Sequence, residues 1–72
     1  MARDICIGLG DRIRQLRKER GWRQIDLAEH AGVHENYISD VEIGRKEMCL
    51  RTLQAIAHAF DIKTAELLNG LD

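Results

Sequence analysis

The chain of 72 residues lacks proline altogether and holds only three aromatic residues. Proline is the least favourable residue inside a helix, so its absence, together with abundant Leu, Ala, Arg, Glu and Gln, favours an all-α fold. The length suits one domain and no more. A chain this short buries only about 60% of the surface that it exposes when unfolded, and we therefore expect a narrow margin of stability.

Long hydrophobic runs are also absent, because the longest one spans only a handful of residues. No segment of the sequence is therefore long enough to cross a membrane. The N-terminus "MARDICIGLG" carries an acid at position 4 and too short an apolar stretch for a signal peptide. We expect the protein to reside in the cytoplasm.

A strong excess of charge of one sign is likewise missing, since the formal net charge is -1. The charges are unevenly distributed, however: residues 1–23 carry a net +4 and residues 24–72 a net -5. Such asymmetry permits a basic face on a nearly neutral protein. A solvated helix surface gives the same pattern, so charge alone does not identify a nucleic-acid binder.

Reactive and metal-binding residues are scarce. Cys6 and Cys49 lie 43 positions apart, and we expect two reduced thiols because disulfide frameworks use more cysteines and an oxidising compartment. His30, His34 and His58 show no metal-ligand spacing with them. The chain also offers no nucleophile–base pair and no phosphate-binding loop, so we expect neither an enzyme nor a cofactor or metal site.

What the sequence does contain is apolar residues at helical spacing in five segments. The clearest stripe places Leu53, Ile56 and Phe60 on one face. No segment alternates with a period of two, so no strand is expected. The segments span residues 9–21, 23–32, 34–44, 49–60 and 64–70. They predict a compact five-helix domain over residues 9–70, preceded by an N-terminal extension over residues 1–8.

The second and third segments carry the pattern of a helix-turn-helix at about residues 24–42. Ala28 is small, which lets the next helix cross close to it. Gly32 can adopt the left-handed conformation that a tight turn between two helices needs. Apolar side chains that fill the angle between the two helices follow at Val33, Ile38 and Val41. In such a motif the second helix lies in the major groove of DNA.

With "RKERGW" before it and "EIGR" after it, this motif resembles the Cro and lambda-repressor-like (XRE-type) helix-turn-helix family over residues 9–68. The resemblance implies a lambda-repressor-like fold and a transcriptional regulator that binds a palindromic operator in double-stranded DNA as a homodimer. The "YISDVE" stretch is similar to that of the small controller proteins of restriction–modification systems. Two alternatives stay open: a phage- or plasmid-type repressor, or an antitoxin-like protein-interaction module that autoregulates its operon. Contact with RNA polymerase is a further partner to consider.

The third segment is acidic, which is unexpected for a helix that meets a polyanion. On a helical wheel of about 100° per residue, its polar side chains fall on one face and its apolar side chains on the other. Base edges differ from phosphates, because Asn pairs with adenine and Glu or Asp accepts from the cytosine amino group. The residues predicted to read bases are Glu35, Asn36, Ser39 and Asp40.

Affinity must then come from groups that contact the DNA backbone beside the groove. The predicted phosphate contacts are Arg23, Gln24, Tyr37, Arg45 and Lys46, with Arg12 or Lys18 as further candidates. The family usually has Ser or Thr where this chain has Arg23 and His34, at helix N-cap positions. It often has a polar or basic residue where this chain has Ile43.

The resemblance also implies a structural ion pair between Arg17 of the first helix and Glu42 of the third, which removes Arg17 from the DNA contacts. Trp22 is expected to pack at the end of the first helix rather than against a base.

A homodimer would form through the C-terminal end, where apolar residues crowd a helix of barely two turns. The predicted interface consists of Phe60, Ile62, Leu67, Leu68 and Leu71. The N-terminal stretch "ICIGL" is the second candidate, since a terminus often frays. Two-fold pairing matches a palindromic site.

Overall fold

The computed structural model describes residues 4–71, which form five helices and no strand. The helices are α1 (Ile5–Glu19), α2 (Gln24–Ala31), α3 (Glu35–Glu42), α4 (Leu50–Ala59) and α5 (Thr64–Leu67). The predicted all-α, five-helix fold is therefore confirmed. Within residues 4–71, no helix combines the length and apolar character needed to cross a membrane.

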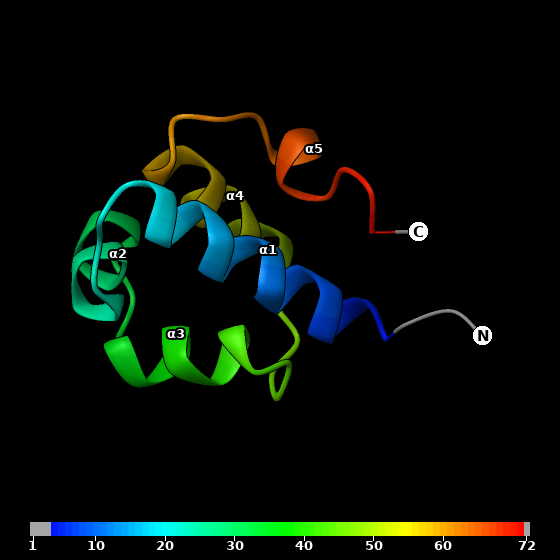
Figure 1. Ribbon diagram of the computed structural model, residues 1–72, viewed down its shortest axis with the longest axis horizontal. Coiled ribbons are helices and arrows are strands. Elements are labelled where there is room, and N and C mark those ends of the chain that lie inside the picture. Colours follow the sequence, from blue (N-terminus) through cyan, green and yellow to red (C-terminus); the bar gives the residue numbers. More distant parts are fainter. Residues whose placement is uncertain (1–3, 72) are drawn as a thin grey trace.

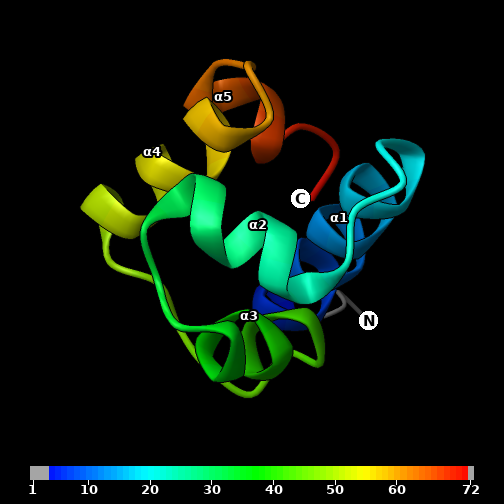
Figure 2. The same ribbon diagram turned by 90° about the vertical axis from the view of Figure 1, so that its left-hand side faces the viewer.

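Helix α3 lies along one edge of the domain, with α1 on its inner side (Figure 1). Seen from the end, α2 lies between α3 and α4 (Figure 2). The short α5 covers α4 and α1 on the side of the domain away from α3 (Figure 1). Among residues 4–71, no element covers the outer face of α3 in this arrangement (Figures 1 and 2).

Helix α1 begins earlier than the apolar spacing predicted. The Asp4 side chain accepts hydrogen bonds from the backbone N–H groups of Cys6 at 2.8 Å and Ile7 at 3.4 Å. Such an N-cap satisfies N–H groups that have no partner inside the helix. Residues 5–8, assigned to an N-terminal extension, are thus the first turns of α1, and that boundary is corrected to Ile5.

Every helix contributes at least one buried side chain to the core. Its fully buried large side chains are Ile13, Leu27, Ile38, Ile56, Phe60 and Leu67, with Val41 close to them. Phe60 and Leu67 were predicted to lie in a dimer interface, and that assignment is wrong because both are 0% exposed inside a single chain. The turn of α5 points Leu67 inward, and α4 ends with Phe60 directed to the same core.

The turn between α2 and α3 has the predicted geometry. Gly32 closes α2 with a φ of 72°, in the left-handed region that suits glycine. His34 is the N-cap of α3, and its Nδ1 accepts from the backbone N–H of Asn36 at 3.0 Å. The imidazole therefore caps the helix as a Ser or Thr side chain would at this position.

Helices α1 and α3 approach so closely that only glycine fits at position 10. A Cβ on Gly10 would lie 2.4 Å from the backbone oxygen of Val41 and 2.6 Å from that of Glu42. Gly10→Ala should therefore lower the free energy of unfolding by about 1–3 kcal/mol, because the helices must separate. Urea denaturation measures the change.

The matched control for this prediction is Gly8→Ala in the same helix. Its Cβ would meet only the end of the Leu71 side chain, at 3.3 Å. Alanine also has a higher helix propensity than glycine, by roughly 1 kcal/mol. Gly8→Ala should therefore be neutral or stabilising. A Gly10→Ala variant as stable as its Gly8→Ala counterpart would contradict the close approach of α1 and α3.

Candidate nucleic-acid interface

The uncovered face of α3 carries short polar side chains. Glu35 and Asn36 are exposed, and Ser39 and Asp40 are half-buried. The opposite face packs into the domain through Ile38 and Val41. All four side chains predicted to read bases therefore lie on the face that a groove of DNA could approach.

An ion pair fixes α3 against α1. Arg17 Nε donates to Glu42 Oε2 at 2.7 Å, and a second guanidinium nitrogen donates to Glu42 Oε1 at 3.0 Å. The Arg17 side chain is 12% exposed and that of Glu42 is 3% exposed. The hydrogen bonds that Arg17 donates to Glu42 raise the pKa of the Arg17 guanidinium, against the opposing effect of its burial. The predicted structural pair is confirmed.

Two more contacts extend this pair to α2. The third guanidinium nitrogen of Arg17 donates to the backbone oxygen of Trp22 at 2.8 Å. Gln24 Nε2 donates to Glu42 Oε1 at 3.1 Å. Gln24 was predicted to contact a phosphate, and the structure instead places its amide on the Glu42 carboxylate. Glu42 thus joins α3 to both α1 and α2.

Arg23 lies at the start of α2 with its side chain 79% exposed. It cannot cap the helix by accepting hydrogen bonds, since a guanidinium has only donors. The Asp26 carboxylate instead accepts from the Arg23 backbone N–H at 2.7 Å and from the guanidinium at 3.0 Å. These hydrogen bonds lower the pKa of Asp26. The ion pair leaves Arg23 at the surface, where it can still reach a phosphate.

Tyr37 is directed away from the outer face of α3. Its side chain is half-buried toward the start of α4. Burial raises the pKa of Tyr37, nearby Cys49 raises it further, and a hydrogen bond with the Thr52 side chain opposes both. Tyr37 thus lies beside the residues at the start of α4, and its contact with a phosphate stays a prediction.

The predicted phosphate contacts after α3 remain at the surface. Arg45 and Lys46 are both exposed in the segment that joins α3 to α4. The Arg45 backbone N–H donates to the Asp40 backbone oxygen at 2.9 Å, which holds the start of this segment against the end of α3. Two cations thus stand beside the C-terminal end of the polar face.

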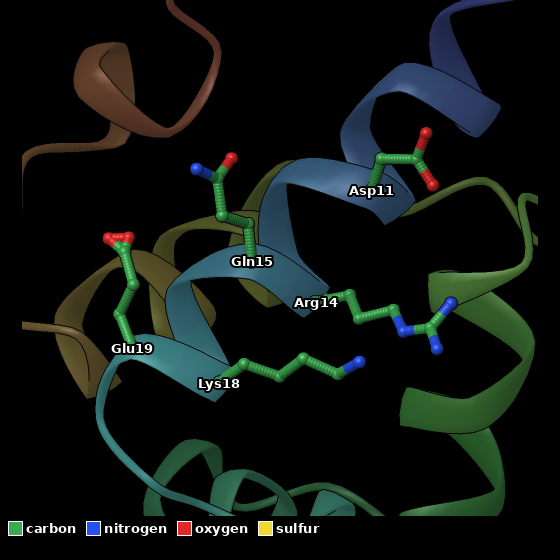
Figure 3. A pocket seen from close by; sticks show the side chains of 5 residues that line it. All are labelled: Asp11, Arg14, Gln15, Lys18 and Glu19. Atoms are coloured by element: carbon green, nitrogen blue, oxygen red, sulfur yellow. The ribbon is translucent and has the colours of Figure 1, made fainter.

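Besides Arg45 and Lys46, helix α1 supplies a second pair of basic residues, which the sequence analysis did not identify as a pair. Arg14 and Lys18 are exposed and one helical turn apart. Both extend toward the side on which α3 lies, whereas Gln15 and Glu19 extend the other way (Figure 3). The spacing in the sequence could have indicated this position. Arg14 follows Gly10 by four positions and so lies on the same side of α1 as Gly10, which is packed against α3.

Arg12, a further candidate for phosphate contact, has a different role. Its guanidinium donates to the backbone oxygen of Glu66 at 2.9 Å, which joins α1 to the end of α5. That contact lies on the side of α1 away from α3. Lys18 is therefore the better placed of the two candidates on this helix.

Trp22 packs where it was expected, beyond the end of α1. Its ring stacks on His30 with centroids 4.3 Å apart and on Phe60 with centroids 5.7 Å apart. The Arg20 guanidinium lies over the Trp22 ring, 5.8 Å from its centroid, and donates to the Phe60 backbone oxygen. These contacts indicate that Trp22 has a packing role in the domain rather than a role in binding a base.

The two candidate surfaces for dimer formation meet at one apolar hollow, which Leu68 of the C-terminal part shares with Ile5 of the N-terminal part. Leu68, 37% exposed, lines an apolar hollow together with residues from the start of α1 and from α4. Leu71 is half-buried and would touch a Cβ built on Gly8. Ile62 lines a separate hollow beside α5. The residues around the apolar hollow are Ile5, Cys6, Leu9, Glu47, Met48, Leu53 and Leu68.

The cysteines and acidic groups form no metal or disulfide site among residues 4–71. Cys6 is half-buried, Cys49 is exposed, and neither takes part in a disulfide. No group of three His, Cys, Asp or Glu side chains in that range is placed to hold a metal ion.

Comparison with known proteins agrees with this geometry. Residues 13–67 match the family described as Helix-turn-helix. The chain is 42% identical over 64 residues to the HTH-type transcriptional regulator DdrOP3 of Deinococcus deserti, covering 89% of this chain and 50% of that protein. It thus spans half the length of this relative, and it spans 59% of the regulator SinR of Bacillus licheniformis.

Two solved structures extend the comparison. The restriction–modification controller protein C.AhdI from Aeromonas hydrophila is 34% identical, with a TM-score of 0.84 over 86% of this chain and 94% of that one. SinR, the master regulator for biofilm formation, in complex with DNA is also 34% identical, with a TM-score of 0.79 over 85% of this chain and 98% of that one. The backbone of α1–α5 is thus shared with proteins that regulate genes.

Proposed function

The chain belongs to the Helix-turn-helix family, and from this premise we propose that it is a transcriptional regulator that binds a palindromic operator as a homodimer. Its role resembles that of a restriction–modification controller protein, since the similarity to C.AhdI covers 94% of that chain. A regulator of this kind acts where DNA is, in the cytoplasm of its host.

The observation that carries this proposal is the uncovered polar face of α3 with cations on its flanks. Glu35 and Asn36 are exposed on that face. Arg14 and Lys18 extend from α1 toward its side (Figure 3), and Arg45 and Lys46 follow its end. Short polar groups between two sets of cations fit a groove, with base edges in the middle and phosphates on either side.

The acidic residues of α3 fit the same scheme. A carboxylate cannot bind a phosphate, but it accepts a hydrogen bond from the cytosine amino group. It also disfavours bases that present only acceptors at that place. We therefore assign discrimination to the acidic face and affinity to the cations beside it.

Selection of bound DNA from a random pool tests the proposed function directly. We expect a two-fold symmetric sequence whose half-sites are centred about 10 base pairs apart, or a multiple of that. The symmetry would report the homodimer, and the spacing would report the separation of the two α3 helices. Recovery of DNA without a shared sequence would contradict a specific operator.

Substitutions should separate base reading from phosphate contact. Asn36→Ala is expected to relax the preference at one base pair of each half-site, at a cost of roughly 1–3 kcal/mol for a good bidentate contact. Arg45→Ala should weaken binding to all sequences alike and reduce the dependence of log K on log salt by about one unit per protomer. Titrations of cognate and single-mismatch operators at several salt concentrations measure both effects.

The control for these titrations is Lys63→Ala. Lys63 is exposed at the start of α5, and α5 covers the side of the domain away from α3. Its removal should leave the salt dependence almost unchanged. If Asn36→Ala lowers the affinity for every sequence by the same factor, α3 is not the reading helix.

A further inference from the structure

Ile43 is an apolar side chain at an unusual place. It follows α3 directly and is 57% exposed, more than any other isoleucine among residues 4–71. At about 100° per residue it projects between Ser39 and Asn36, on the polar face of the helix. The two residues before it, Val41 and Glu42, are buried. Ile43 therefore stands beside the proposed base-reading groups and not in the core.

The backbone holds this side chain in a defined position. The Ile43 N–H donates to the Ser39 backbone oxygen at 3.4 Å. Gly44 follows with a φ of 75°, and a Cβ at that residue would lie 2.7 Å from Ile7 Cγ1 and 2.9 Å from Ile7 Cα. Helix α1 is thus packed against the turn immediately after Ile43. The backbone at this point is thus closely restricted, which sets the direction of the Ile43 Cα–Cβ bond.

Ile7, 41% exposed, packs against Gly44 and is the exposed apolar residue beside the turn that follows Ile43. Three other exposed apolar residues line hollows elsewhere. Ile5 and Leu68 line the apolar hollow between α1 and α4, and Leu50 lies by another hollow beside α4. Ile43 lines neither of them. A role in the proposed homodimer surface therefore does not account for its exposure.

We propose that Ile43 is a specificity-determining residue that contacts the 5-methyl group of a thymine in the major groove. This inference rests on the proposed function. In the major groove the thymine methyl is the apolar group that distinguishes one base from the others, and aliphatic side chains make contact with it. The neighbouring side chains on this face are polar, so Ile43 adds a type of readout that they cannot provide.

Replacement of thymine by deoxyuridine in the selected operator tests this contact, because uracil lacks only the methyl group. For the wild-type protein, we expect one thymine position in each half-site at which the replacement weakens binding about four-fold. This is the effect of losing the burial of one methyl-sized group against the protein. Ile43→Ala should bind the thymine and uracil operators equally at that position. Ile43→Val, which keeps a branched apolar side chain, should retain part of the preference.

The matched control is Ile25→Ala, the same substitution at an exposed isoleucine of α2. It should leave every thymine preference of the wild type in place. Identical uracil profiles for the wild type and Ile43→Ala would overturn the contact, as would a wild type that is insensitive to uracil throughout the operator. In either case a selected palindrome would still support the proposed function. A failed selection, in contrast, would remove both.

Discussion

Glu42→Ala should lower the free energy of unfolding by about 3–5 kcal/mol, because it strands the half-buried charge of Arg17. Glu42 accepts from Arg17 at 2.7 Å and 3.0 Å and from Gln24 at 3.1 Å. Its loss leaves those donors without their acceptor in a place where the Arg17 side chain is only 12% exposed. Thermal and urea denaturation of parent and variant measure the change.

An exposed ion pair of the same domain provides the control. Arg23→Ala removes the guanidinium that pairs with Asp26. The Arg23 side chain is 79% exposed, and an exposed ion pair contributes little to stability because water already solvates both charges. The double variant Arg17→Met with Glu42→Met should be more stable than Glu42→Ala alone, since no charge is left unpaired. If Glu42→Ala costs no more than Arg23→Ala, the pair is not the joint between the helices that the structure indicates.

The helix-turn-helix could be predicted because its determinants are local. Ala28 and Gly32 define the crossing and the turn within a few residues, and both predictions agree with the structure. The bond between Arg17 and Glu42 is not local, since 25 positions separate them. Family resemblance supplied that pair; the spacing of charges in one sequence could not.

Errors arose where a residue has two plausible environments. The apolar residues of a short helix do not reveal which leucine faces its own core, so Leu67 was assigned to a dimer surface although it is fully buried. Gln24 was assigned to a phosphate because its partner Glu42 lies on another helix. The start of α1 was placed four residues late, because the cap by Asp4 is a side-chain contact that apolar spacing does not register.

The acidic character of α3 can be interpreted only with the neighbouring helix in view. In sequence, the helix has no cation of its own. In the fold, α1 extends Arg14 and Lys18 toward its side (Figure 3). Two of the seven basic side chains of residues 1–23 thus lie on the side of the domain on which α3 lies.

Leu68→Glu should convert a wild-type homodimer into a monomer and lower operator affinity at least about 100-fold, since paired binding modules typically gain 10²–10⁴ in avidity over single ones. Leu68 lines the apolar hollow formed by α1 and α4, where a second copy would bury a charge without a partner. Sedimentation at micromolar concentration and operator titration measure the two effects.

The control is Leu50→Glu, the same change at a residue that is 80% exposed and lies outside that hollow. This variant should sediment as the wild type does. A wild type that remains monomeric without DNA would refute a stable dimer, and a dimeric Leu68→Glu variant would place the interface elsewhere.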